Sequence, residues 1–377
     1  MGLLEDLQHA FNVDGHQPLN DWSDVVNELS EIIITYPDVD SKNYIINGAM
    51  DIAQRGTSFS SVANGTYTLD RWKYHKSGAA AHTVTQDTDV PSNSIFTKSV
   101  KLDCTTADTS IAATDGTSFR QHIEGYVFKN LVGKTATLSF WVKATKVGIY
   151  CVSFFNKGFD RSYVSEFTIN ETETWEYKTI TVTFDYSDGT WNYTNGIGLT
   201  VNFTLAIGSD YYTTPNTWQN GIYVATSNQV NGTDSTDNNF WLTGVVLNEG
   251  TEAAPYQPFG GTYESDLQAC ERRYKKSYAL ADPPGTDTVN GSVQRQARAT
   301  NAMAGFEWQR MADIPTVTIY STNGTANKVT TAVDVDIGTS VTALSVGAVA
   351  CRSLLDSGSR LTSGVFYQFH YTLECEL

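Results

Sequence analysis

A two-residue alternation of apolar and polar side chains constrains the fold of this 377-residue chain more than any other feature. Residues 199–207 carry Leu, Val, Phe, Leu and Ile at every second position, and residues 138–143 and 179–184 repeat the pattern. Successive side chains of a strand point to opposite faces, so these runs predict half-buried strands. No helix-length periodic run occurs between residues 44 and 260, which argues against a βαβ fold. The chain is therefore predicted to be mainly β.

Residues 1–43 differ from all that follows, with nine acidic residues and one basic residue. They contain two apolar stripes at helical spacing, which predict a short α-helical segment. The second stripe consists of Trp22, Val25, Val26, Leu29, Ile32 and Ile33. Two short helices cannot bury both stripes alone, so they pack on their own β-domain, dock into a partner or bundle with sister chains. We expect an attachment element and a homotrimer.

A linker at residues 253–261 separates two β-regions. After it, Tyr263 to Ala279 reads as a linking helix whose basic residues are expected on a solvated face. Alternation at residues 328–337 and 365–374 then predicts a C-terminal β-sandwich. The predicted organisation is a helical segment at 1–43, a central sandwich at 44–260, and a helix with a second β-domain at 261–377.

Charge and motif content argue against several functions. A net charge of −16 disfavours nucleic acid and anionic membranes as partners, and no apolar run approaches the ~20 residues of a membrane span. The start of the chain lacks signal-peptide features, so we expect folding in a bacterial cytoplasm. Five cysteines without short spacing and six scattered histidines suggest no disulfide framework, metal site or cofactor.

Several short motifs together resemble a group of phage and prophage tail-associated proteins. They are NYIINGAMDIAQRGTSF from residue 43, NGTYTLDRWKY from 64, FRQHIEG from 119, KTATLSFWVKAT from 134, NNFWLTGVVLNEG from 238 and CERRY from 270. The resemblance implies a jelly roll like the carbohydrate-binding modules attached to glycoside hydrolases. It further implies a virion structural protein, a fibre or spike subunit that contacts other virion proteins through residues 1–43. It does not distinguish the head from the tail.

Related modules hold a structural calcium ion with a carboxylate from an Asp-Asp-Val motif on the last strand. The corresponding stretch here, Leu242-Thr243-Gly244-Val245, lacks the acidic residues. Asp51 remains near the first strand, but one carboxylate is a poor site for a hard cation. We expect no metal.

Sugar binding needs an exposed aromatic face with hydrogen-bonding groups beside it. Trp141 lies opposite Phe140 in its strand and has polar neighbours, so we expect it to point outward. Its alternative role is packing under a loop or against a neighbouring subunit. The candidate glycan-binding residues are Trp141, Tyr163, Gln121 and Arg161.

These observations predict a non-enzymatic virion subunit that contacts host-surface glycans, which the net charge suggests are neutral or cationic. One alternative is a purely structural decoration or adaptor protein without sugar binding. A polysaccharide depolymerase is a third possibility, but no pair of carboxylates is singled out for glycoside hydrolysis.

Overall fold

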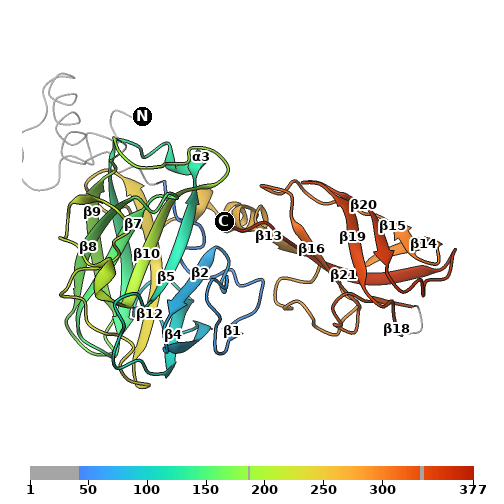
Figure 1. Ribbon diagram of the computed structural model, residues 1–377, viewed down its shortest axis with the longest axis horizontal. Helices are drawn as coiled ribbons and strands as arrows, with labels where there is room; N and C mark the ends of the chain where they lie inside the picture. The colour runs from blue at the N-terminus through green and yellow to red at the C-terminus, as the bar shows by residue number, and fades with distance from the viewer. Residues whose placement is uncertain (1–41, 186, 332–334) are drawn as a thin grey trace, which may run out of the picture. The chain divides into compact units, whose positions relative to one another are not determined.

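The computed structural model describes residues 42–185, 187–331 and 335–377. It confirms a mainly β protein built from antiparallel sheets (Figure 1). The helical attachment segment predicted at residues 1–43, including Trp22, Val25, Val26, Leu29, Ile32 and Ile33, lies outside the described residues except for its last two positions. Lys42 is exposed, whereas Asn43 is already buried in the central domain.

Two six-stranded sheets form the central sandwich. The first sheet, in spatial order, contains β1 (Ser58–Phe59), β3 (Ala81–Asp87), β4 (Ser99–Thr106), β12 (Asn239–Glu249), β6 (Thr135–Ala144) and β9 (Glu176–Thr183). The second contains β11 (Trp218–Asn220), β8 (Arg161–Ile169), β7 (Gly148–Phe155), β10 (Ile197–Ile207), β5 (Gly116–Glu124) and β2 (Trp72–Ser77). Because neighbouring strands in each sheet are mostly distant in sequence, the order is that of a jelly-roll sandwich.

The core between the two sheets is rich in aromatic side chains from alternate strand positions. Trp72 stacks on Phe119 with ring centroids 5.3 Å apart, and Phe140 meets Phe203 edge-on at 5.1 Å. These rings come from β2, β5, β6 and β10, so they connect both sheets. The prediction that Phe140 points into the core is confirmed.

β10 departs from the predicted half-buried pattern because its polar side chains are buried as well. Thr204 donates its hydroxyl hydrogen to the carbonyl oxygen of Val224, and Gln229 donates to that of Thr204. The segment after η1 (Ser209–Tyr211) therefore covers part of the outer face of the second sheet. Alternation in β10 correctly marked the core face but could not show this cover.

The linking helix is shorter than predicted. α4 spans Tyr263–Glu271, and residues Tyr274–Lys276 form β13, which pairs with β21 (Phe366–Glu374). Thr262 caps the start of the helix by accepting a hydrogen bond from the backbone NH of Ser265. Pairing with β21 satisfies the backbone of residues 274–276, so a distant strand overrides the local helical pattern.

Two basic residues expected on a solvated face are buried instead. Arg273 is 2 % exposed and donates through Nε to a carboxylate oxygen of Glu124 at 2.8 Å. It also donates to the carbonyl oxygens of Asn195 and Cys375. Lys276 donates to the carbonyl oxygens of Gln54, Leu280 and Asp282. These contacts join α4, β13 and the end of the chain to the jelly roll.

The C-terminal strands are connected as one antiparallel sheet around a separate core, which contains Met303, Phe306, Trp308 and Phe369. Its main path is β18 (Asp336–Ile337), β17 (Val329–Thr330), β21, β14 (Val293–Ala299), β15 (Ala302–Ala304), β20 (Cys351–Asp356) and β19 (Val341–Val346). β16 (Thr316–Tyr320) pairs with β21 and packs against β19. The alternation at residues 365–374 is confirmed by β21, and within 328–337 the described residues form strands at Val329–Thr330 and Asp336–Ile337.

Candidate functional site

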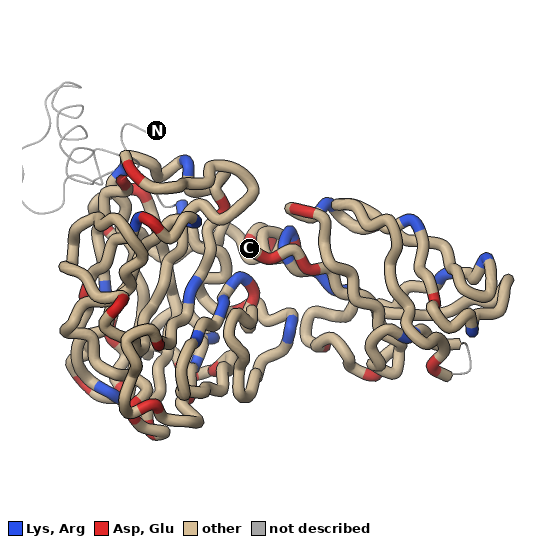
Figure 2. Tube along the Cα trace, in the orientation of Figure 1, with Lys and Arg blue, Asp and Glu red and all other residues tan. Residues whose placement is uncertain are grey.

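A groove of about 560 Å³ lies on the outer face of the second jelly-roll sheet, over β2, β5 and β10. One wall is apolar and includes Tyr211, Ile222 and Val224 from the covering segment. A largely hydrophobic cavity of this size with a few convergent polar groups is typical of a small-ligand site. Figure 2 shows Lys and Arg residues on the neighbouring β2 and β5 strands.

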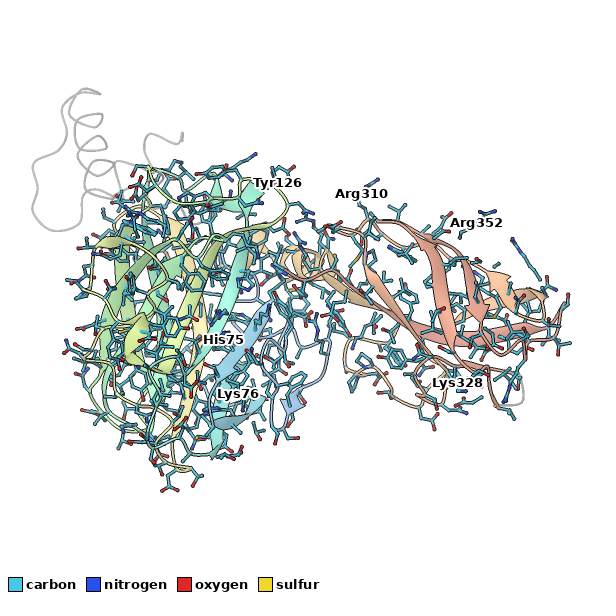
Figure 3. All side chains as sticks on the ribbon, in the orientation of Figure 1. His75, Lys76, Tyr126, Arg310, Lys328 and Arg352 are labelled. Carbon is cyan, nitrogen blue, oxygen red and sulfur yellow. The ribbon has the colours of Figure 1, made fainter. Side chains whose placement is uncertain are left out.

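Strand alternation places the basic side chains in this groove. Trp72 and Tyr74 of β2 point into the core, so Lys73 and His75 point outward into the groove; Figure 3 labels His75. On β5, Arg120 and His122 alternate with core-facing positions in the same way. Lys73 is the direct cross-strand partner of Arg120. Two adjacent antiparallel strands thus align four basic side chains on one surface.

Hydrogen bonds hold two of these groups in position. Arg120 donates from Nη2 to the Ser118 hydroxyl at 2.8 Å, and its guanidinium lies 5.7 Å from the Phe155 ring centroid. His122 Nδ1 lies 2.8 Å from the Thr200 hydroxyl oxygen. The Nε of Arg120 is buried and has no hydrogen-bond partner among the described residues. The groove therefore contains an oriented guanidinium with unused donor capacity.

The basic groups also destabilise one another's charged forms. Burial, together with Arg120 and Lys73, lowers the pKa of His75 to about 4. Burial is also the main cause that lowers the pKa of Arg120 to about 10 and the pKa of His122 well below its ordinary value. At neutral pH both imidazoles are thus neutral and can accept or donate a hydrogen bond, while Arg120 keeps its charge.

An exposed aromatic ring stands at the rim of the groove. Phe159 is 48 % exposed, and its ring centroid lies 5.9 Å from that of Phe155. The turn between β7 and β8 holds Phe159 at a φ of 55°, a conformation uncommon for a residue other than glycine. Asp160 fixes this turn by accepting hydrogen bonds from Asn156 and Thr190. The ring is therefore presented by a locally constrained turn.

A second aromatic surface lies on the outer face of the first sheet. Trp141 is half-buried, and its ring centroid lies 5.2 Å from that of the exposed Tyr177. Beside them, Lys143 pairs with Asp89 and lies 4.2 Å from the ring centroid of Trp241. The outward orientation predicted for Trp141 is confirmed.

The structure does not bring the four predicted glycan-binding residues together. Gln121 is buried, and its side chain both donates to and accepts from the backbone of Ile46, so it fixes the first segment of the domain instead of facing solvent. Tyr163 packs in the core against Phe154 and Trp218. These two placements correct the prediction, because both side chains lie on the core-facing side of the second sheet.

Arg161 is also engaged within the protein. It forms an ion pair with Asp185 and donates to the side-chain oxygen of Asn220 at 2.7 Å. Trp141 remains on the opposite sheet. Sequence reasoning missed the basic residues of the groove. A signal for them was present in the motifs FRQHIEG and RWKYH, where basic side chains alternate with side chains of the core.

The departure from the calcium motif coincides with a backbone irregularity. The pairing of β12 with β6 shifts register between Thr243 and Val246, and Gly244 has a φ of 62°. Asp51 accepts a hydrogen bond from the Thr97 hydroxyl. Among the described residues, no three His, Cys, Asp or Glu side chains are grouped to hold a metal ion. No helix in this part of the chain is long and apolar enough to cross a membrane.

Comparison with known proteins gives no family-model match and no match among curated proteins. Among solved structures, the chain is similar to the enzymatically active domain of bacteriophage CBA120 tailspike protein 4, at 16 % identity and a TM-score of 0.29. That match covers 51 % of this chain and 21 % of the tailspike chain, so this chain spans about a fifth of that protein.

Two carbohydrate-binding modules are also similar. A CBM61 structure in complex with β-1,4-galactotriose matches at 11 % identity and a TM-score of 0.29, covering 56 % of this chain and all of the module. A family 11 module of a Clostridium thermocellum cellulosomal cellulase matches at 9 % identity and a TM-score of 0.30, covering 52 % of this chain and 97 % of the module. At these scores the likenesses carry no conclusion about function, and the strand order itself defines the sandwich.

Proposed function

We propose that this protein is a non-enzymatic glycan-binding subunit whose jelly roll holds sugar in the groove over β2, β5 and β10. The observation that supports this proposal is the combination of apolar surface, the exposed Phe159 ring and oriented polar groups in one cavity. A pyranose presents an apolar face to an aromatic ring and hydroxyl groups to hydrogen-bonding partners. The neutral imidazoles of His75 and His122 suit such hydroxyl groups.

The described lining of the groove favours binding over hydrolysis. It contains no Asp or Glu, whereas glycoside hydrolysis ordinarily uses two carboxyl groups facing each other across the sugar. A depolymerase is therefore less well supported than a binding module. A structural adaptor without sugar binding remains the main rival, and the binding experiment below separates the two.

We further propose that the subunit belongs to a phage fibre or spike and is located in the virion. The motifs between residues 43 and 278 and the separate composition of residues 1–43 support this setting. Attachment through residues 1–43 would present the jelly roll to the host surface. Affinity per site is expected near the millimolar level, about −4 kcal/mol, and several copies per particle would raise avidity.

The surface around Trp141 and Tyr177 is a second candidate sugar site. Two neighbouring rings, one of them exposed, offer a stacking surface on the first sheet. An alternative role for this surface is contact with a neighbouring subunit. Because it lies on the opposite sheet from the groove, single substitutions can distinguish the two sites.

The test is a glycan array probed with the full-length protein and with Phe159→Ala, Trp141→Ala and Tyr126→Ala. Tyr126 is a matched control, because it is an exposed ring outside the groove with a lysine beside it, as Phe159 is (Figure 3). We expect Phe159→Ala to weaken binding and Tyr126→Ala to leave it unchanged. Loss only with Trp141→Ala would move the site to the first sheet. Absence of binding to every glycan would support the structural adaptor.

A further inference from the structure

The groove has an unbalanced positive charge within an acidic protein. Its described lining contains Lys73, Arg120 and Lys157 but no carboxylate side chain. None of these three residues has an Asp or Glu within ion-pair distance among the described residues, whereas Arg55, Arg71 and Arg161 of the jelly roll each form an ion pair. Lys73 donates at 3.4 Å to a main-chain oxygen of Leu377, the last residue of this chain, so a terminal carboxylate lies beside Lys73. Arg120 and Lys157 are then the cations of the groove that have no anionic partner among the described residues.

Arg120 is the residue for which this imbalance matters most. Among the described residues, its side chain donates a hydrogen bond only to the Ser118 hydroxyl, and its buried Nε has no partner. Arg120 is half-buried, and a partly desolvated guanidinium without an anionic partner is unfavourable, because the desolvation is not offset by a charge. A planar anion that enters the groove would remove this penalty through paired hydrogen bonds, since the guanidinium fork matches a carboxylate.

The surrounding groups define the rest of the ligand. Phe159 offers an exposed ring that packs on the buried Phe155, and Ile222 and Val224 add apolar side chains to the same lining. Simple inorganic anions would leave these apolar surfaces unused. A sugar that carries a carboxylate would use both parts of the groove.

We propose that the groove binds an acidic glycan, with a sugar carboxylate held by Arg120 and with Lys157 adding positive charge to the same lining. This inference rests on the proposed glycan-binding function and specifies its ligand class. It replaces the earlier prediction, which was a neutral or cationic glycan and was based on the net charge, with a negatively charged ligand. The net charge of −16 is a sum over the whole chain, whereas a bound ligand responds mainly to charges within a Debye length of about 10 Å, so the Arg and Lys residues of the lining set the charge that it meets.

The experiment measures binding of the full-length protein to matched pairs of oligosaccharides. Each uronic-acid or N-acetylneuraminic-acid glycan is paired with its carboxyl-reduced form, and a sulfated glycan and its desulfated form serve as a further pair. We expect each carboxylated member to bind about tenfold more tightly than its reduced partner, as one charge-assisted hydrogen bond would give. This preference should shrink as NaCl rises from 50 mM to 500 mM.

Two lysine substitutions provide a matched comparison. Lys157 and Lys129 are both exposed lysines beside an aromatic ring, but only Lys157 lines the groove. Lys157→Gln should weaken binding of the carboxylated glycan several-fold more than that of its reduced form, and Lys129→Gln should change neither. Arg120→Gln should abolish the preference, provided that its circular dichroism and melting temperature show an intact fold.

The outcomes separate this inference from the proposed function. Equal binding of the carboxylated and reduced members, or equal effects of Lys157→Gln and Lys129→Gln, would overturn the acidic ligand while retaining a glycan-binding groove. A preference confined to the sulfated pair would also overturn the carboxylate assignment. If neither member of any pair binds, the glycan-binding function itself fails.

Discussion

Single buried ionisable residues contribute to the pH dependence of this protein's stability. Asp266, at the start of α4, is 4 % exposed and accepts a hydrogen bond from the backbone NH of Asn47 at 2.8 Å. Burial raises the pKa of this carboxyl group to about 7. The folded state therefore holds a proton that the unfolded chain releases near its ordinary pKa, so this group's contribution to stability is lost as pH rises towards 7.

The first prediction concerns the variant Asp266→Asn. An amide oxygen can accept the hydrogen bond from Asn47 without ionising, so the variant should lack this pH-dependent loss. Between pH 5 and pH 8, the free energy of unfolding of the parent protein should fall by about 2 to 3 kcal/mol relative to the variant. Urea unfolding at both pH values measures the difference. Asp188→Asn, at an exposed position, is the control, and parallel pH profiles for Asp266→Asn and the parent would contradict the assignment.

At the scale of a secondary-structure element, β12 shows how a local irregularity sets the shape of a sheet. Its register shift between Thr243 and Val246 coincides with Gly244 in a left-handed conformation. A β-carbon on Gly244 would lie 2.5 Å from Cζ of Phe96 and 3.1 Å from Cδ1 of Trp141. The register of the strand thus shifts where there is no room for a side chain, next to the ring of Trp141.

The second prediction follows from that crowding. Gly244→Ala should lower the free energy of unfolding by about 1 to 3 kcal/mol, through backbone strain and the contact with Phe96. Gly261→Ala is a better matched control than Gly250→Ala, because Gly261 has a φ of 87°, nearer to that of Gly244 than the 113° of Gly250, and its added β-carbon meets nothing within 4 Å. We expect the control to lose less stability in the same thermal or urea unfolding experiment. Equal losses would mean that backbone strain alone accounts for the effect.

At the scale of the whole molecule, the described chain begins its packing at Asn43. The side chain of Asn43 donates to the carbonyl oxygens of Val245 and Gln257 and accepts from the backbone NH of Ile45 and Leu247. A truncation that removes residues 1–43 would also remove these buried hydrogen bonds. A truncation that begins the chain at Lys42 retains them and tests residues 1–41 alone.

The third prediction is that this truncated chain folds as a monomer. The full-length chain is expected to be a trimer, because the apolar stripes of residues 1–41 need a partner surface. Light scattering should report about three chain masses for the full-length protein and one for the truncated protein, with similar melting temperatures. A trimeric truncated chain would place the subunit contacts on the β-domains. An unfolded one would show that residues 1–41 pack on their own jelly roll.

Local pattern alone determined the class of fold and many residues of its core. Alternation over residues 138–143 and 199–207 identified Phe140 and Phe203 as buried and Trp141 as outward-facing. It succeeded because side-chain direction in a strand depends only on residue parity. The same principle applies to β2 and β5, where basic residues of the groove alternate along the strand with residues of the core.

Tertiary structure decided the features that depend on distant segments. The cover over β10, the ending of α4 at Glu271 and the burial of Gln121 each arise from contacts with remote parts of the chain. The groove forms only because β2, β5 and β10 become neighbours in the sheet. Its positive charge depends on the same pairing, which places Lys73 next to Arg120. Composition sums charge over the whole chain, whereas a ligand responds to charge within about one Debye length of ~10 Å, so the ligand class could be inferred only from the folded molecule.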